Sequence, residues 1–315
     1  MKILSRPKKN AQEYGRWAVN PYLGCTGGCL YCYRNTGPGK KVIGGSAVRL
    51  KKGVVSNNHA YHLAMAEIIE YKDEIIRDGG LFMTFTSDPC LPETNKLFTQ
   101  ILADCIRDHG IPVTLLTKHY ADVYSWINEL RIEIHTFFVD GGESPARYNC
   151  DNLSRLAIGY TLTGHDELEP NAPSNANRIK DMAHIKDFIG GDKFHVWASI
   201  EPVIDFDSSF RMIQQALDAG CRHFKIGLMT ERTKVCRRGF TLGGKTFEPY
   251  DPARCLAFVQ DVMQQTRGRA TVYWKQSFRE FIGGTGKHRL FTDDELHKIF
   301  DDYPNSVGKD WNFWK

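Results

Sequence analysis

Apolar stretches of strand length alternate with amphipathic stretches between about residue 17 and residue 276. The apolar stretches predict strands, and the segments between most of them predict helices. The predicted strands lie at residues 16–24, 81–87, 111–118, 132–140, 156–164, 193–204, 223–229 and 270–278. Strands that alternate with helices form parallel βαβ units. The pattern therefore predicts the α/β class, as a full or partial barrel or as a doubly wound sheet.

Three of the intervening segments carry clear helical signals. The segment 94–106 places its apolar side chains on one helical face, namely Leu97, Phe98, Ile101, Leu102, Cys105 and Ile106. The segment 208–219 is expected to be capped by Asp207 or Ser208 and ended by Gly220. A third helix is expected from Ala64 to Ile76, with an apolar stripe through Met65, Ile68, Ile69 and Ile76.

Polar residues follow the first three predicted strands. A run of cysteines follows the first, Ser87 and Asp88 follow the second, and Thr117 and Lys118 end the third. The carboxyl ends of parallel strands meet at one edge of a sheet, where α/β proteins bind their ligands. We therefore expect a functional site at this edge.

The cysteine run CTGGCLYC contains Cys25, Cys29 and Cys32, and no fourth cysteine or histidine follows closely. Thiolates bind zinc, copper(I) or iron–sulfur clusters. A structural zinc site takes four ligands, so Cys90 or His119 would have to complete it. A cubane cluster held by three cysteines instead leaves one iron open to a substrate or cosubstrate.

Composition narrows the class of protein. The chain has 315 residues, a net charge of +4 and nine cysteines, of which the six outside the run are expected to be mostly buried. No apolar run could span a bilayer, and the N-terminus has no secretory apolar region, so we expect a cytoplasmic protein. Residues 40–52 and 232–245 each carry several basic and no acidic side chains, which would suit phosphates.

The motif CTGGCLYC resembles the signature of the radical S-adenosylmethionine (SAM) enzymes, and NPYLGCTGGCLYCY resembles their spore photoproduct lyase-like (DNA repair photolyase-like) branch. Four later segments resemble strand segments of the same branch: LFMTFTSDPCLPE, PVTLLTKH, TLTGHDELEPNAPSNANRI and FHVWASIEPVID. The resemblance covers about residues 14–230.

The resemblance implies a partial (β/α)6 radical SAM barrel over residues 14–230, with an insertion at about 131–155. Residues 231–315 would form a C-terminal α/β extension that packs on this core. It also implies a [4Fe-4S] cluster and SAM as cofactors, and a flavodoxin- or ferredoxin-type electron donor. The reduced cluster would cleave SAM to a 5′-deoxyadenosyl radical, which abstracts hydrogen from a substrate.

The resemblance also assigns roles to individual residues. Cys25, Cys29 and Cys32 match the cluster ligands, and Tyr31 matches an aromatic residue beside the adenine. Three further residues match positions that bind the methionine part of SAM: Asp88 its amino group, with a hydrogen bond from Ser87, and Lys118 its carboxylate.

Two weaker matches and one departure complete the assignment. Thr161 matches a serine that touches the cosubstrate, and Glu169 fits a polar residue in the same mouth. Phe85 stands where the lyase has its hydrogen-donor cysteine, so we take Cys90, which could act from the same rim, as a candidate catalytic residue. Tyr33, which matches a tyrosine of the lyase's YCY segment, is a second candidate.

The GGE at residues 141–143 resembles another SAM-binding motif, but it follows an extra strand and is interpreted as a turn.

The substrate is the least determined feature. The branch resemblance and the basic segments favour a nucleic acid or nucleotide, which the enzyme would repair or modify. Lys275 and Arg279, which lie among aromatic residues near the last strand, could grip a phosphate-bearing substrate. Two alternatives remain: a radical SAM enzyme acting on a peptide or small molecule, and a non-enzymatic zinc or iron–sulfur protein that binds nucleic acid.

Overall fold

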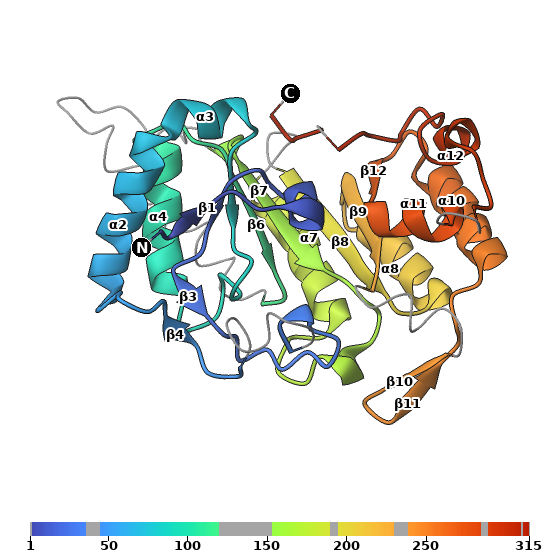
Figure 1. Ribbon diagram of the computed structural model, residues 1–315, viewed down its shortest axis with the longest axis horizontal. Coiled ribbons are helices and arrows are strands. Elements are labelled where there is room, and N and C mark those ends of the chain that lie inside the picture. The colour runs from blue at the N-terminus through green and yellow to red at the C-terminus, as the bar shows by residue number, and fades with distance from the viewer. Residues whose placement is uncertain are drawn as a thin grey trace.

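The computed structural model describes residues 2–35, 45–119, 153–189, 195–229, 239–284, 289–309 and 311–314. Within these residues a sheet has the strand order β1-β2-β5-β6-β7-β8-β9-β12 (Figure 1). Its strands are β1 (Leu4–Ser5), β2 (Ala18–Val19), β5 (Leu81–Met83), β6 (Val113–Thr117), β7 (Leu156–Thr161), β8 (His195–Val203), β9 (His223–Leu228) and β12 (Thr271–Trp274).

The strand pairs confirm the predicted partial α/β barrel. Strand β1 is antiparallel to β2, and each later pair of neighbours in this sheet is parallel. From β2 to β9 the strands lie side by side in sequence order, as successive βαβ units require. Strand β12, from the predicted C-terminal extension, adds to the same sheet beside β9. The exact division into core and extension stays a prediction.

Helices and short pairs of strands connect these strands. The α-helices are α2 (Asn57–Glu70), α3 (Lys72–Arg77), α4 (Asn95–Arg107), α7 (Asn175–Ile189), α8 (Phe206–Asp218), α10 (Pro252–Thr266), α11 (Gln276–Gly283) and α12 (Asp293–Phe300). The 3-10 helices are η1 (Lys9–Glu13), η2 (Tyr33–Asn35) and η3 (Asp166–Leu168). Strand β3 (Tyr22–Leu23) pairs with β4 (Arg49–Leu50), and β10 (Phe240–Leu242) pairs with β11 (Lys245–Phe247). Helices α2 and α4 lie together at one end of the sheet, and α10, α11 and α12 at the other (Figure 1).

Seven of the eight predicted strands correspond to strands of the structure, and the eighth, 132–140, lies outside the described residues. The first predicted strand, 16–24, divides into β2 and β3, which belong to different sheets. Pro21 lies between them. Proline has no backbone N–H to donate to a strand ladder, so it favours a break at this point.

The predicted helix at 94–106 is confirmed as α4, and all six of its apolar residues are buried. The third predicted helix, from Ala64 to Ile76, is wrong in extent, because α2 starts at Asn57 and ends before Tyr71. The backbone of Tyr71 is not helical, with φ −106° and ψ 17°. After this break α3 buries Ile75 and exposes Ile76, and Ile69 of the expected stripe is exposed on α2.

The predicted cap of the helix at 208–219 is also wrong. Helix α8 is capped by Asp205, whose Oδ1 accepts a hydrogen bond of 2.7 Å from the backbone N–H of Ser208. Gly220 follows the helix with φ 91°, as predicted for its end. Asp205 and Asp207 both carry a carboxylate that could cap the helix. The residue at which the first helical turn begins decides that Asp205 is the cap.

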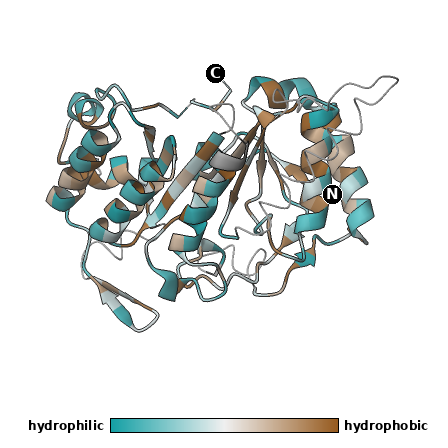
Figure 2. Ribbon diagram, turned by 180° about the vertical axis from the view of Figure 1, so that it is seen from behind, coloured by the Kyte–Doolittle hydropathy of each residue, from teal (hydrophilic) through white to brown (hydrophobic). Residues whose placement is uncertain are grey.

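Apolar residues fill both faces of the sheet, and the strands are predominantly apolar in Figure 2. The largest buried cluster lies between the sheet and the helices, and a smaller one includes Phe82 and Trp197 on the other face. The C-terminal segment packs near the amino ends of the strands. There the Trp311 ring stacks on His223 at 3.8 Å, and Trp314 Nε1 donates to the carbonyl of Gly79 at 3.0 Å.

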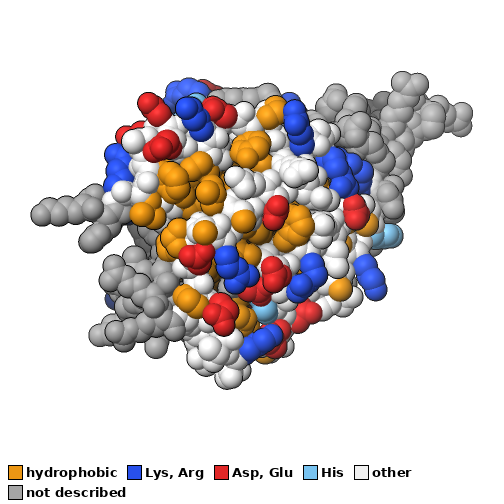
Figure 3. Space-filling view, turned by 90° about the vertical axis from the view of Figure 1, so that its right-hand side faces the viewer, with side chains coloured by type: hydrophobic (Ala, Val, Ile, Leu, Met, Phe, Trp, Pro, Cys, Tyr) orange, Lys and Arg blue, Asp and Glu red, His pale blue; other side chains and the backbone are white. Residues whose placement is uncertain are grey.

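Figure 3 views the molecule from its right-hand side in Figure 1. Acidic and basic side chains alternate there around apolar ones, so the described residues on this face form no single basic patch. Within the described ranges, no helix has the length and apolar character needed to span a membrane.

A close approach between two strands of the sheet predicts the effect of one substitution. Gly159 on β7 pairs with Trp197 on β8, and a Cβ at residue 159 would lie 2.2 Å from Trp197 Cε2. We expect Gly159→Ala to destabilise the protein by about 1–3 kcal/mol through overpacking, as measured by urea denaturation.

Gly308→Ala is the matched control, because a Cβ at residue 308 would meet nothing within 4 Å. Trp197→Leu should remove most of the cost of Gly159→Ala when the two are combined. If Gly159→Ala lowers the stability by the same amount in the wild type and in the Trp197→Leu background, the steric explanation is contradicted.

Candidate active site

A cavity of about 430 Å³ opens at the carboxyl edge of the sheet. Its wall includes all three clustered cysteines together with Ser87, Asp88 and Lys118 from the ends of β5 and β6. The structure thus brings together the residues that the sequence placed after three separate strands. Tyr31, Tyr33 and Thr161 also line this cavity.

The cysteine loop follows β3 and is held by the segment after β7. The backbone N–H of Leu30 donates to the carbonyl of Leu168 at 3.0 Å, and Asn171 Nδ2 donates to the carbonyl of Thr26 at 2.8 Å. A Cβ at Gly27 would lie 3.3 Å from Cys25 Sγ and 3.9 Å from Cys29 Sγ. The glycine therefore leaves room between two of the thiols.

The thiols lie in a weakly solvated environment. Burial raises the pKa of Cys25 to about 11 and also raises the pKa of Cys29, which Lys118 partly counteracts. Arg34 Nε donates to Cys32 Sγ at 3.4 Å. Among the described residues, no three His, Cys, Asp or Glu side chains are grouped as ligands of one metal ion. A cubane cluster does not require such a group, because each cysteine binds a different iron.

Two polar side chains join the ends of neighbouring strands beside the cysteines. Asn20, after β2, accepts hydrogen bonds of 2.8 Å from Thr84 Oγ1 and from the N–H of Phe85, both after β5. Asp88 accepts bonds from Thr117 Oγ1 at 2.7 Å and from the N–H of Lys118 at 3.0 Å, and so connects β5 to β6.

Asp88 therefore has a structural role in addition to the ligand-binding role expected for it. Its Oδ1 also accepts from the N–H of Cys90 at 2.9 Å, which closes the turn after β5. Three protein donors leave a carboxylate with little remaining capacity for a ligand.

Ser87 and Lys118 retain hydrogen-bonding capacity. Ser87 Oγ is buried and has no hydrogen-bond partner within the described part of the chain. Lys118 is half-buried, and its Nζ lies 5.6 Å from the centre of the Tyr31 ring. Burial lowers the pKa of Lys118, but Cys29 and Glu169 outweigh it and raise that pKa above the ordinary value. The lysine is thus a cation without an ion-paired carboxylate among the described residues.

Glu169 lies behind the cavity wall and contacts Tyr31 from there. One carboxylate oxygen of Glu169 accepts a hydrogen bond from the Tyr31 hydroxyl. The other forms an ion pair with Arg178, and both of these side chains are 0% exposed. Arg178 also donates to the carbonyl of Thr161. In this geometry Glu169 orients Tyr31, and the expected contact of Glu169 with a cosubstrate stays a prediction.

The two candidate catalytic residues differ in position. Cys90 is 0% exposed, belongs to the main apolar core and is not on the cavity wall, so this geometry does not support its action from the rim. Its position follows from the turn after Asp88, which directs the side chain into the core. Tyr33 lines the cavity, and its hydroxyl donates to the carbonyl of Phe85.

The far wall of the cavity contains a charged cluster of which sequence reasoning named only Lys275. Glu201 Oε2 accepts from Lys275 Nζ at 2.6 Å and from the hydroxyl of Tyr14, which lies 2.8 Å from Ser199 Oγ. Lys275 Nζ also lies 3.5 Å from Glu13 Oε2. The only signal for this cluster in the sequence was the position of its residues at the carboxyl ends of strands. Ser199 and Glu201 lie near the end of β8, and Lys275 directly follows β12.

The expectation that Lys275 and Arg279 grip a phosphate is not supported by this geometry. Lys275 is paired with Glu201, and Arg279 forms two bonds, of 2.6 and 2.9 Å, with Asp301. Both cations already have carboxylate partners.

Several sequence predictions lie outside the described residues. These are the GGE at 141–143, most of the insertion at 131–155, Cys150, Cys236 and the first parts of the two basic segments, 40–44 and 232–238.

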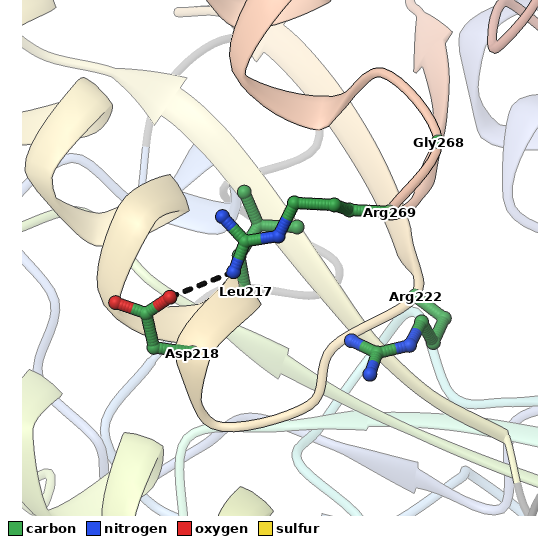
Figure 4. Close-up of a pocket in the computed structure, with 5 residues that line it drawn as sticks. All are labelled: Leu217, Asp218, Arg222, Gly268 and Arg269. Carbon is green, nitrogen blue, oxygen red and sulfur yellow. Dashed lines mark hydrogen bonds and ion pairs between the residues drawn. The ribbon is translucent and has the colours of Figure 1, made fainter.

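A second depression lies at the opposite edge of the sheet. It is lined by Leu217, Asp218, Arg222, Gly268 and Arg269 (Figure 4). Arg222 and Arg269 precede β9 and β12, and Arg269 bonds to Asp218 at 2.7 Å. Because it lies at the amino ends of these strands, it is separate from the cysteine-lined cavity.

Neither a protein-family model nor a curated protein matches the sequence. Three crystal structures of SuiB from Streptococcus suis resemble the fold. SuiB alone gives a TM-score of 0.47 at 11% identity over 87% of this chain and 53% of SuiB. SuiB bound to S-adenosylmethionine gives a TM-score of 0.48 at 12% identity, over 84% of this chain and 51% of SuiB. SuiB bound to the precursor peptide SuiA gives a TM-score of 0.50 at 11% identity, over 90% of this chain and 54% of SuiB.

This chain therefore spans about half the length of the SuiB chains, and at these identities the similarity concerns the fold alone.

Lys225, behind the far wall, is buried among charged groups. Its Nζ donates to the carbonyl of Glu13 at 2.8 Å and lies 5.4 Å from the ring centres of Tyr14 and Trp197. Burial and the positive charge of Lys275 lower the pKa of Lys225 to about 7, against the opposing effect of Glu13 and Glu201.

This lowered pKa predicts a pH-dependent stability. An unfolded lysine titrates near about 10.4, so between about pH 7 and 10 the unfolded chain binds more protons than the folded one. The cost of burying charged Lys225 is present in full below pH 7 and disappears as the pH rises. Lys225→Met should therefore gain stability relative to the wild type at pH 6 and lose most of that advantage by pH 9.5, as measured by urea denaturation.

Lys180→Met, at an exposed position of α7, should show no such change with pH. A stability difference between Lys225→Met and wild type that stays constant from pH 6 to 9.5 would contradict the prediction.

Proposed function

We propose that this protein is a radical SAM enzyme in which Cys25, Cys29 and Cys32 hold a [4Fe-4S] cluster and the adjoining cavity binds SAM. The observation that carries the proposal is that these three thiols share one cavity with Ser87 and Lys118. No fourth thiol is on the cavity wall among the described residues, which suits a cluster with one open iron.

The cavity has unfilled bonding capacity that fits these two groups. Gly27 leaves space between Cys25 and Cys29, and a buried guanidinium nitrogen of Arg34 has no partner in the described part of the chain. Buried donors of this kind are costly unless a ligand satisfies them. Ser87 Oγ and the Lys118 cation, which forms no ion pair with a described carboxylate, add donors for a ligand that carries a carboxylate.

When bound, the reduced cluster and SAM supply a 5′-deoxyadenosyl radical that abstracts hydrogen from a substrate. The protein residues bind and orient the groups. Lys118 would bind the carboxylate of SAM, with Ser87 donating a further hydrogen bond, and Tyr31 would lie against the adenine in the orientation set by Glu169. Thr161 would contribute a polar contact from the end of β7.

Asp88 would act mainly by holding Lys118 and Ser87 in place, with one oxygen toward the SAM amino group. Phe82, Phe85 and Tyr14 line the cavity and would exclude water from the reacting groups. Tyr33 is the remaining candidate for a catalytic side chain of the wall. A flavodoxin- or ferredoxin-type protein is the proposed electron donor.

For the substrate we rank a peptide above a nucleic acid. The neighbour with the highest of the three TM-scores, SuiB, is bound to a precursor peptide, and this supports a peptide as the first candidate to test. The nucleic-acid alternative rested on the branch resemblance, on the basic segments, whose first parts are outside the described residues, and on Lys275 and Arg279, which have carboxylate partners.

The decisive experiment is anaerobic reconstitution followed by reduction with dithionite in the presence of SAM. We expect about four irons per chain and release of 5′-deoxyadenosine, measured by liquid chromatography with mass spectrometry. Cys29→Ala should lose the iron and the product, whereas Cys105→Ala, which removes a core thiol, should keep both.

A zinc-containing protein without iron, or an iron-containing protein that never cleaves SAM, would refute the proposed function. Deuterated peptide and oligonucleotide pools then separate the two substrate classes, because only the true substrate transfers deuterium to 5′-deoxyadenosine.

A second prediction concerns the SAM carboxylate. Lys118→Met should retain the iron but weaken SAM binding by about 1.5–3 kcal/mol, more than tenfold, because a charge-assisted bond is lost. Isothermal titration calorimetry of the reconstituted protein measures this change, with Lys180→Met as the control that should bind SAM normally. Iron loss in Lys118→Met would show that the assignment of Lys118 is wrong.

A further inference from the structure

Arg34 lies two residues after the last cysteine of the run, in η2, and is not explained by cofactor binding as described so far. Its side chain lines the cavity, and the residue is only 6% exposed. The Nε–H group donates to Cys32 Sγ at 3.4 Å, so a guanidinium ion contacts one of the three thiols directly.

The remaining part of the guanidinium group lacks a protein acceptor. Arg34 Nη1 is buried, and no hydrogen-bond partner for it exists among the described residues. No carboxylate of the described chain forms an ion pair with Arg34, in contrast to Arg178 and Arg279, which pair with Glu169 and Asp301. A buried arginine without a carboxylate is stable only beside another source of negative charge.

Among the described residues, Cys32 Sγ is the acceptor that Arg34 contacts, and a cysteine that binds a metal does so as the anionic thiolate. A cluster held by thiolates carries sulfur acceptors and negative charge, and it would satisfy both the bonded and the unbonded nitrogens. Reduction of the cluster adds one more negative charge at this place. A nearby cation and a hydrogen bond to a ligand sulfur both favour the reduced form.

We propose that Arg34 is a positioning and tuning residue that raises the reduction potential of the cluster through its hydrogen bond to Cys32 and its charge. The inference rests on the proposed function, since it requires a cluster on the three cysteines. It goes beyond that function in assigning control of the electron-transfer step to a residue that is not a ligand.

The test compares Arg34→Gln and Arg34→Lys with the wild type after reconstitution. Redox titration followed by electron paramagnetic resonance gives the midpoint potential without relying on turnover. We expect Arg34→Gln to shift the one-electron equilibrium at least tenfold toward the oxidised cluster, which is about 59 mV at one electron. Arg34→Lys keeps the charge but loses the Nε donor, so its shift should be smaller and in the same direction.

Arg211→Gln is the charge-matched control, because it removes one positive charge at an exposed position of α8. Its midpoint potential should equal that of the wild type. Iron content and the thermal midpoint of each variant, measured on the same samples, separate tuning from loss of the cluster.

The outcomes distinguish this inference from the function on which it rests. If the wild type binds no cluster, the proposed function fails. If the wild type has its cluster and Arg34→Gln keeps both the iron and the wild-type potential, the tuning role is overturned while the function stands. Loss of iron from both Arg34 variants would also overturn it, because Arg34 would then be needed for assembly of the site.

Discussion

The Asp88 carboxylate joins the ends of β5 and β6, and the geometry of the cavity depends on that connection. It accepts hydrogen bonds from Thr117 Oγ1 and from the backbone of Lys118, while Asn20 makes the equivalent connection between the ends of β2 and β5. Parallel strands bring these ends to one edge, but hydrogen bonds between side chains set their relative height. The cysteine loop, Ser87 and Lys118 face one space because these connections hold.

Charge is distributed unequally around that space. On the far wall, Glu201 and Lys275 neutralise each other, and Tyr14 donates to the same carboxylate. On the near wall, Arg34 and Lys118 lie beside thiols and have no carboxylate paired with them in the described residues. Buried cations of this kind require an anionic ligand. The near wall is therefore suited to hold negatively charged groups, and the far wall is already balanced.

Local patterns predicted much of the fold but little about side-chain partners. The periodicity of residues 94–106 predicted α4 correctly, because its apolar face is wide and uninterrupted. The break at Tyr71 escaped prediction, since nothing in the local sequence forbids a continuous helix there. Cys90 was expected at the rim and lies in the core, because a backbone turn decides the direction of its side chain.

By itself, the sequence determined the α/β class, the parallel order of strands and the three thiols with their short spacing, because these depend on local periodicity and on adjacent residues. It also placed Ser87, Asp88 and Lys118 after strands that end at one edge. Only the tertiary structure decided that Asp88 serves its own fold, that Glu169 supports Tyr31 from behind, and that Arg34 contacts Cys32. These partners depend on hydrogen-bond geometry and charge balance in three dimensions, which spacing along the chain does not contain.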